Sequence, residues 1–150
     1  MNYGKIEALR DLDELFCKNN IFSYSYKLLE FYGTENLIKH STRVYEYYIN
    51  NPISDSAYGS VLCLLHDLWE DTTLPHDFTD DIYLLKLMKL ITHNKEDSYE
   101  DYIQRIKDCA REYPEAYYVK LADIKDHLML KDTLTDKLKE KYLGALRILL

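Results

Sequence analysis

Apolar residues recur at intervals of three and four along nearly the whole chain, which is the spacing of one face of an α-helix. No segment alternates apolar and polar residues convincingly, as a half-buried strand would. Only four glycines and three prolines occur in 150 residues, so long loops are not expected. We therefore predict a single all-α domain over residues 1–150, a compact bundle of about seven helices. The expected helical segments are 6–19, 23–32, 34–50, 54–69, 79–93, 98–113, 114–130 and 135–150.

Capping and turn residues indicate where these helices begin and end. The residues expected to open helices are Thr34, Ser54, Thr79, Ser98, Pro114 and Thr135. The helix that contains His66 is expected to continue unbroken through Trp69. Residues 132–142 are expected to form a turn and a solvated helix face.

Charge and cysteine content narrow the class of protein. Lys and Arg total 19 against 26 Asp and Glu, a net charge of −7, which argues against broad nucleic-acid binding. An anionic substrate would therefore need a local cation, either a metal ion or a cluster of Lys and Arg. The widely spaced cysteines, without a CxxC motif, indicate reduced thiols: Cys17, Cys63 and Cys109. The charged N-terminal segment does not resemble a signal peptide, and no apolar run has membrane-spanning length, so we expect a cytoplasmic protein that does not enter a membrane.

Three predicted helices carry a polar residue inside their apolar stripe. His40 lies between Leu37 and Val44, His66 follows Leu62 and Leu65, and Asp123 follows Val119. Asp67 stands beside His66. Helix bundles build metal sites from inward-facing side chains on neighbouring helices. These four polar residues could therefore meet in the core.

The chemistry of this set suits a divalent ion. Two imidazoles and two carboxylates match Mn²⁺, Fe²⁺ or Zn²⁺, with coordination positions left for water and substrate. Glu70 and Asp71 lie one helical turn beyond the His66–Asp67 doublet and could hold an attacking water as general base or orienter. Taken singly, His40 or Asp123 could be a satisfied core residue, and residues 66–71 could be a solvated helix end. The metal interpretation explains all four stripe positions together.

Several segments resemble a known family. A His, an "HD" doublet and a distant Asp form the metal signature of the HD superfamily of phosphohydrolases. The fuller resemblance is to the (p)ppGpp hydrolase domain of RelA/SpoT-type enzymes and to their small stand-alone relatives, and it covers about residues 35–130. Here "HDLWEDT" resembles "HDxxEDT", "VKLADIKDHL" resembles "VKLADxxHNx", and "LITHNKEDSYEDYIQRI" resembles "LTRRKGExYxxYIxRI".

This resemblance implies an HD-domain fold and assigns roles to individual residues. It implies that one Mn²⁺-like ion is held by His40, His66, Asp67 and Asp123, and that Glu70 and Asp71 activate the water. Lys120 of the "KLAD" motif is then either structural or in contact with phosphate. On the substrate side it places Lys95, Tyr99 and Tyr102.

The residues that flank these motifs leave alternatives open. Lys39 and Arg43, beside His40, could neutralise phosphate or form a solvated face. His127 stands where the family has Asn and could be an additional ligand, a substrate contact, or a core or surface histidine. Asp126 replaces the preceding His, "HNK" at 93–95 replaces "RRK", and the family's upstream "HxGQxRxxGxPY" run is missing. The metal centre therefore matches the family better than the substrate pocket does.

From these motifs we expect a metal-dependent phosphohydrolase acting on a small phosphorylated nucleotide. The most specific expectation is a (p)ppGpp-type 3′-pyrophosphohydrolase. The alternatives are a hydrolase of nucleoside mono- or triphosphates, and a non-catalytic metal-binding regulatory module. Tyr45, Tyr47 and Tyr48 could support an interface between two copies of the chain.

Overall fold

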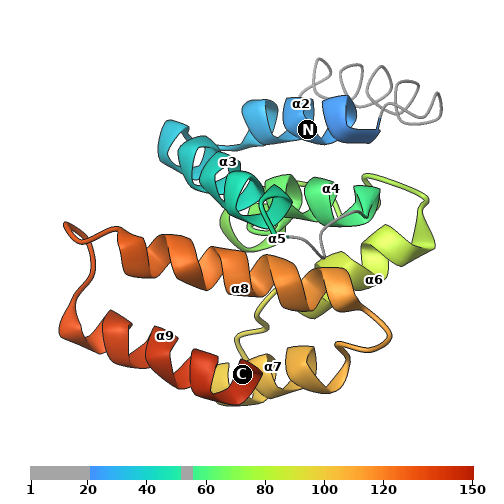
Figure 1. The fold of residues 1–150 in the computed structure, drawn as a ribbon. Helices are drawn as coiled ribbons and strands as arrows, with labels where there is room; N and C mark the ends of the chain where they lie inside the picture. Colours follow the sequence, from blue (N-terminus) through green and yellow to red (C-terminus); the bar gives the residue numbers. More distant parts are fainter. Residues whose placement is uncertain (1–20, 52–55) are drawn as a thin grey trace.

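A computed structural model describes residues 21–51 and 56–150 of the chain. This part of the chain is helical without strands, and it contains seven helices of nine residues or more together with the single turn α5, which confirms the all-α prediction (Figure 1). The elements are α2 (Ile21–Tyr32), α3 (Glu35–Ile49), α4 (Ala57–Leu65), α5 (Leu68–Asp71), α6 (Ile82–Ile91), α7 (Tyr99–Asp108), α8 (Pro114–Met129) and α9 (Asp136–Leu149). The predicted helix at 6–19 and the predicted start at Ser54 lie outside the described residues.

Most of the predicted helix starts are confirmed. The side chains of Thr34, Ser98 and Thr135 each accept a hydrogen bond from the backbone N–H three residues on, as N-cap residues do. Pro114 is the first residue of α8, where its missing N–H costs nothing. The prediction for α6 is wrong by two residues, because Asp81 and not Thr79 caps this helix.

The predicted unbroken helix through Trp69 is also wrong. The helix α4 ends at Leu65, and the short α5 begins at Leu68, so His66 and Asp67 lie in the junction between them. In a continuous helix, consecutive side chains point about 100° apart. Both residues keep right-handed helical backbone angles, and their side chains still meet, with His66 Nε2 3.2 Å from Asp67 Oδ2.

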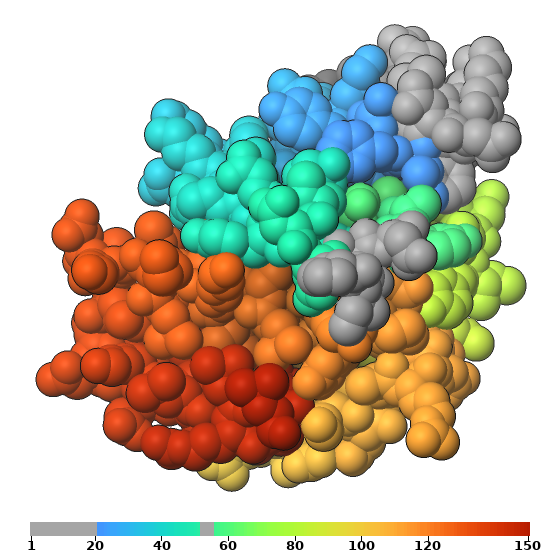
Figure 2. Space-filling view, in the orientation of Figure 1, coloured from blue at the N-terminus to red at the C-terminus, as the bar shows by residue number. Residues whose placement is uncertain are grey.

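The long helix α8 lies between two groups of helices. On one side, α2, α3, α4 and α6 form the larger apolar core with the first half of α8. On the other side, α7 and α9 form a smaller core with Ile124 of α8. Figure 1 shows α8 crossing the middle of the molecule, and in Figure 2 its atoms form a band between α3 and α9. The buried polar residues of α8, among them Lys120 and Asp123, therefore lie between the two groups.

Of the three tyrosines expected at an interface, Tyr48 is buried, whereas Tyr45 and Tyr47 are half-buried. Tyr48 is buried against α4, where a Cβ on Gly59 would lie only 1.7 Å from the Tyr48 hydroxyl. Tyr48 is therefore a core residue, which contradicts its assignment to an interface. The ring of Tyr45 contacts Phe22, and the ring of Tyr47 contacts the Lys125 ammonium.

Two further findings concern membrane-spanning helices and the cysteines. None of the described helices combines the length and the apolar character needed to cross a membrane. Cys63 is buried and Cys109 half-buried, and both are free thiols, whereas Cys17 lies outside the described residues.

Candidate metal centre

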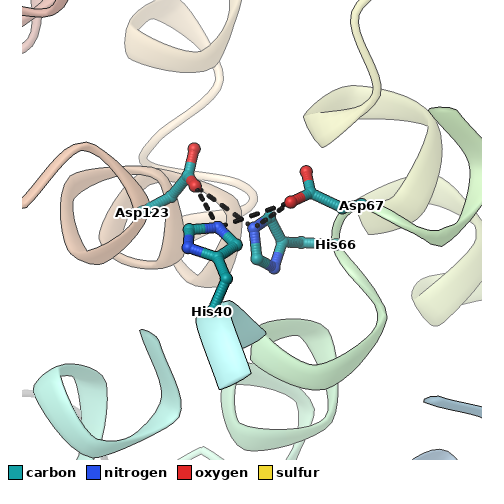
Figure 3. Close-up of side chains that lie close together, drawn as sticks. All are labelled: His40, His66, Asp67 and Asp123. Carbon is teal, nitrogen blue, oxygen red and sulfur yellow. Dashed lines mark hydrogen bonds and ion pairs between the residues drawn. The ribbon is translucent and has the colours of Figure 1, made fainter. Parts of the chain in front are cut away.

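Four side chains from separate parts of the chain meet beside α8. His40 comes from α3, His66 and Asp67 from the α4–α5 junction, and Asp123 from α8 (Figure 3). One potential ligand atom from each residue lies within 4.8 Å of all the others. His40, His66 and Asp123 are buried, and Asp67 retains 22% of its side-chain exposure. The structure therefore brings together the four residues that the sequence predicts.

The distances within this cluster match those expected between ligands of one ion. His40 Nε2 lies 2.9 Å from Asp123 Oδ1 and 3.4 Å from Asp67 Oδ2. His66 Nε2 lies 3.3 Å and 3.2 Å from the same two oxygens. Ligand atoms about 2.1 Å from a shared ion, at octahedral or tetrahedral angles, are about 3.0–3.4 Å apart. These four distances are therefore compatible with a single divalent ion between the histidines and the carboxylates.

The outer nitrogens of the two imidazoles are tied to acceptors. His66 Nδ1 lies 2.7 Å from the carbonyl oxygen of Cys63, so Nδ1 must carry the proton and donate it. His40 Nδ1 lies 2.6 Å from Asp126 Oδ2 and donates in the same way. In both rings the Nε2 atom consequently faces the carboxylates of Asp67 and Asp123. Histidines that bind metals are oriented by this type of contact on the other nitrogen.

The charges in the cluster also call for a cation. Burial by itself raises the pKa of Asp123, but Lys120 and the surrounding histidines hold it well below its usual range. Burial lowers the pKa of His40, but its hydrogen bonds to Asp123 and Asp67 raise it to about 9. The pKa of Asp67, like that of Asp123, is lowered, so both carboxylates stay ionised. Lys120 balances one of the two negative charges, and the other is left to a protonated imidazole or a metal ion. Two nitrogen and two oxygen ligands suit several divalent ions.

Glu70 and Asp71 stand at the open edge of the cluster. Both line a pocket of about 180 Å³ together with Asp67 and Asp123. The Glu70 carboxylate accepts a hydrogen bond from the backbone N–H of His93, which holds it in place. Burial, followed by the negative charge of Asp67, raises the pKa of both carboxyl groups. A carboxylate of raised pKa that faces a pocket is suited to accept a proton from water.

Lys120 forms an ion pair with Asp123, one of the clustered carboxylates. Its ammonium donates to Asp123 Oδ2 at 2.8 Å and lies over the ring of Tyr102, 5.2 Å from the centroid. Asp123 thus presents Oδ1 to the histidines while Lys120 occupies Oδ2. The contact with Asp123 is a structural one, and Lys120 also lines the pocket, so the predicted alternative of a phosphate contact stays open.

The two predicted tyrosines face the same pocket in different ways. The Tyr102 hydroxyl donates to the carbonyl oxygen of Ile91, so its proton cannot be donated to a ligand in the pocket that Tyr102 lines. The Tyr99 hydroxyl is buried and has no hydrogen-bond partner among the described residues. An unpaired buried hydroxyl beside a pocket indicates a missing partner such as water or a ligand.

A different cavity, of about 680 Å³, opens on the far side of His40. Lys39 and Arg43 both line it, but each already has an acidic partner. Arg43 donates to both oxygens of Asp126, at 2.8 and 3.1 Å, and Lys39 pairs with Glu35 at 2.9 Å. Arg43 therefore supports the carboxylate that orients His40.

His127 lies next to the cluster as a further imidazole. Its Nε2 atom is 3.2 Å from Asp123 Oδ1, and its ring lies between those of His40 and Tyr142. The side chain is 35% exposed and lines both cavities described above. This position is close enough for contact with a ligand or with a substrate.

Two residues of α9 that the sequence did not single out also reach the pocket. Tyr142 is buried and stacks on His127 with the rings almost parallel, at 4°. Lys141 places its ammonium 4.3 Å from the centroid of the Tyr99 ring, and burial together with Lys120 lowers its pKa. The expectation that residues 132–142 form only a turn and a solvated face is therefore wrong at its end. No local pattern marks these two positions, since only the packing of α9 on α8 brings them to the pocket.

The comparisons with known proteins add no family assignment. No protein-family model matches the chain, and a search of the curated proteins finds no match. What the site does must therefore be argued from its own geometry and from the motifs in the sequence.

Proposed function

We propose that the protein is a metal-dependent phosphohydrolase of the HD superfamily that acts on a small phosphorylated nucleotide. The observation that supports this most is the cluster of His40, His66, Asp67 and Asp123 beside the Glu70–Asp71 pair. The specific reaction we propose first is the release of pyrophosphate from the ribose 3′ position of a (p)ppGpp-type nucleotide, because "HDLWEDT" and "KLAD" resemble the motifs of those enzymes. We propose Mn²⁺ as the ion, with Fe²⁺ and Zn²⁺ as alternatives.

Different residues of the chain would accept the proton, bind the phosphate and orient Asp123. An ion at this site supplies a water of lowered pKa and polarises a phosphoryl oxygen. Glu70 and Asp71 accept the proton of the attacking water, for which their raised pKa values suit them. Lys141 and the unpaired Tyr99 hydroxyl offer a positive charge and a donor to phosphate oxygens in the same pocket. Lys120 keeps Asp123 oriented.

One observation favours a different nucleotide as substrate. His127 occupies the position of the family's Asn and packs between His40 and Tyr142. An imidazole held there offers other hydrogen bonds than an amide does. The second candidate is therefore a phosphohydrolase acting on nucleoside mono- or triphosphates.

Product analysis tests this proposal and separates the candidates. Protein loaded with Mn²⁺ is incubated with ppGpp, nucleoside mono- and triphosphates, and a generic phosphodiester. We expect pyrophosphate from ppGpp, whereas orthophosphate or triphosphate from another nucleotide would support the second candidate. The Asp71→Asn variant should be inactive, and Asp80→Asn, which changes an exposed carboxylate outside the pocket, serves as the matched control. Bound metal without turnover of any compound would contradict the proposal and favour a non-catalytic metal-binding module.

A further inference from the structure

A groove of about 990 Å³ adjoins the pocket and is outside the roles assigned so far. It shares Glu70, Asp71 and His93 with the pocket, so the two hollows adjoin at these residues. The rest of its lining includes Trp69, Leu85, Lys89 and Lys95. A molecule that reaches the four clustered ligands could therefore extend into this groove past Glu70 and Asp71.

One wall of the groove is aromatic. Trp69, the single tryptophan of the chain, is half-buried and lies nearly parallel to the exposed imidazole of His76, with centroids 4.3 Å apart and planes at 8°. Phe78 supports the indole edge-on from the core. The indole is thus fixed in position, and it already stacks with a flat heteroaromatic ring. Flat nitrogen heterocycles such as nucleobases bind to aromatic side chains by stacking.

The groove also carries free positive charge. Lys89, near the end of α6, and Lys95, in the following loop, are both exposed. Within the described part of the chain neither makes an ion pair. In a protein of net charge −7, two unpaired ammonium groups beside an aromatic wall favour an anionic aromatic molecule.

The cavity on the far side of His40 has fewer of these features. Of the cations in its lining, Lys39 and Arg43 are paired with acidic side chains, and Lys131 alone is unpaired among the described residues. Among its described lining residues there is no Trp, Tyr or Phe. Of these three hollows, only the groove beside Trp69 combines an indole with two lysines that are unpaired within the described part of the chain.

We propose that this groove binds the nucleobase of a nucleotide, stacked against Trp69, with its phosphates toward the four clustered ligands. Lys89 and Lys95 neutralise the negative charge of the phosphates between the base and the four clustered residues. This inference rests on the proposed function in taking the substrate to be a nucleotide, and it adds the direction in which that nucleotide lies.

Because Trp69 is the only tryptophan, its emission reports on the groove in the unmodified protein. ADP, GDP and inorganic pyrophosphate are titrated into the full chain with Mn²⁺ at saturation, and binding is followed by calorimetry and by Trp69 fluorescence. We expect at least one nucleoside diphosphate to bind about tenfold more tightly than pyrophosphate and to shift or quench the emission, as stacking on an indole requires. Pyrophosphate should leave the emission unchanged. Binding of ADP and GDP without an emission change, without preference over pyrophosphate, or no binding at all would overturn the proposal.

Variants locate the base independently of the emission. Trp69→Leu should remove the preference for the nucleoside diphosphate over pyrophosphate while leaving the affinity for pyrophosphate within about twofold, because stacking on the base is the only ligand contact assigned to this side chain. Met129→Ala, in the far cavity, is the matched control and should change neither affinity. If Met129→Ala no longer bound the nucleoside diphosphate more tightly than pyrophosphate, the base would be placed in the far cavity and the proposal would be overturned.

The lysines supply a second pair of variants. Lys89→Gln combined with Lys95→Gln should weaken nucleoside diphosphate binding about threefold to tenfold. Lys86→Gln removes an exposed charge from the same helix outside the groove and should have no such effect. Equal weakening in both would mean that overall charge alone is responsible, against the proposal.

The product assay described under the proposed function distinguishes the two failures. Turnover without any response of Trp69 would remove the groove assignment and leave the hydrolase. A response of Trp69 without turnover would support the groove and contradict hydrolysis.

Discussion

The four clustered ligands and the Glu70–Asp71 pair are neighbouring sets of charged side chains in very different surroundings. In the cluster, Asp123 is 2% exposed and its pKa is held well below the usual range. In the pair, both carboxylates are exposed at the pocket edge and their pKa values are raised. The pKa of Asp67 is lowered as well, so carboxylates only three positions apart in the sequence, those of Asp67 and Glu70, have opposite pKa shifts.

The difference comes from which partners each carboxylate faces. Within the cluster, the carboxylates face His40 and His66, and Asp123 also pairs with Lys120. These groups compensate the cost of burying the carboxylates. Glu70 and Asp71 face Asp67, a further negative charge, and they gain less from the cations. The first set is therefore suited to hold a cation permanently, and the second to exchange a proton. Variants of the two sets should separate metal affinity from turnover.

The largest expected effect is on metal affinity in the cluster itself. His66→Ala and Asp67→Ala each remove one of four ligands, and we expect metal affinity to fall by about 100-fold or more. Metal content after gel filtration and a competition titration with a chelator dye measure this. Unchanged affinity in Asp67→Ala would show that the cluster is not the metal site.

The next effect should appear in turnover alone. Asp71→Asn and Glu70→Gln keep the shape of the side chain but remove a proton acceptor, so we expect the rate to fall by about 100-fold or more. Metal affinity should stay within about threefold, as the chelator titration would show. If either variant lost metal as Asp67→Ala does, the contrast between the two sets would be wrong.

A smaller effect on metal affinity is expected for Asp126 and Arg43, which contact the cluster but do not belong to it. Asp126→Asn weakens the acceptor that orients His40, and we expect metal affinity to fall by about 10- to 100-fold. Arg43→Gln, which only supports Asp126, should have a weaker effect in the same direction. Equal losses in the two variants would mean that Arg43, and not the acceptor for His40, is the important group.

The smallest effect should come from Lys141. Lys141→Gln removes a positive charge from the pocket without touching the cluster, and we expect about a tenfold lower kcat/KM at unchanged metal content. Lys139→Gln, an exposed lysine of α9 outside the pocket lining, is the control and should behave as the unmodified protein. Steady-state kinetics on whichever nucleotide the product assay identifies measures both. A loss of metal in Lys141→Gln would assign Lys141 to the support of the cluster.

The sequence predicted the metal cluster because the relevant information is local. His40, His66 and Asp123 each interrupt an apolar stripe, and a polar residue in such a stripe faces the core of a helical bundle. The caps at Thr34, Ser98 and Thr135 were predictable for the same reason, since an N-cap hydroxyl bonds only three residues away.

The parts that escaped prediction depend on contacts between distant segments. No glycine or proline marks the junction at His66 and Asp67, so the sequence reads as one helix there. The place of Lys141 at the pocket follows from how α9 packs on α8, and 18 residues separate it from Asp123 on α8 (141 − 123). The pairing of Arg43 with Asp126 likewise joins residues 83 positions apart.

The separation of the clustered ligands along the chain also matters for folding. His40 and Asp123 are 83 residues apart, so an ion shared between them would act as a removable crosslink that closes most of the described chain into one loop. Each tenfold rise of free ion above its dissociation constant would add about 1.4 kcal/mol to the free energy of unfolding. The resistance of the protein to unfolding and proteolysis would then follow the supply of the ion, and the amount of folded protein would record how much metal its surroundings provide.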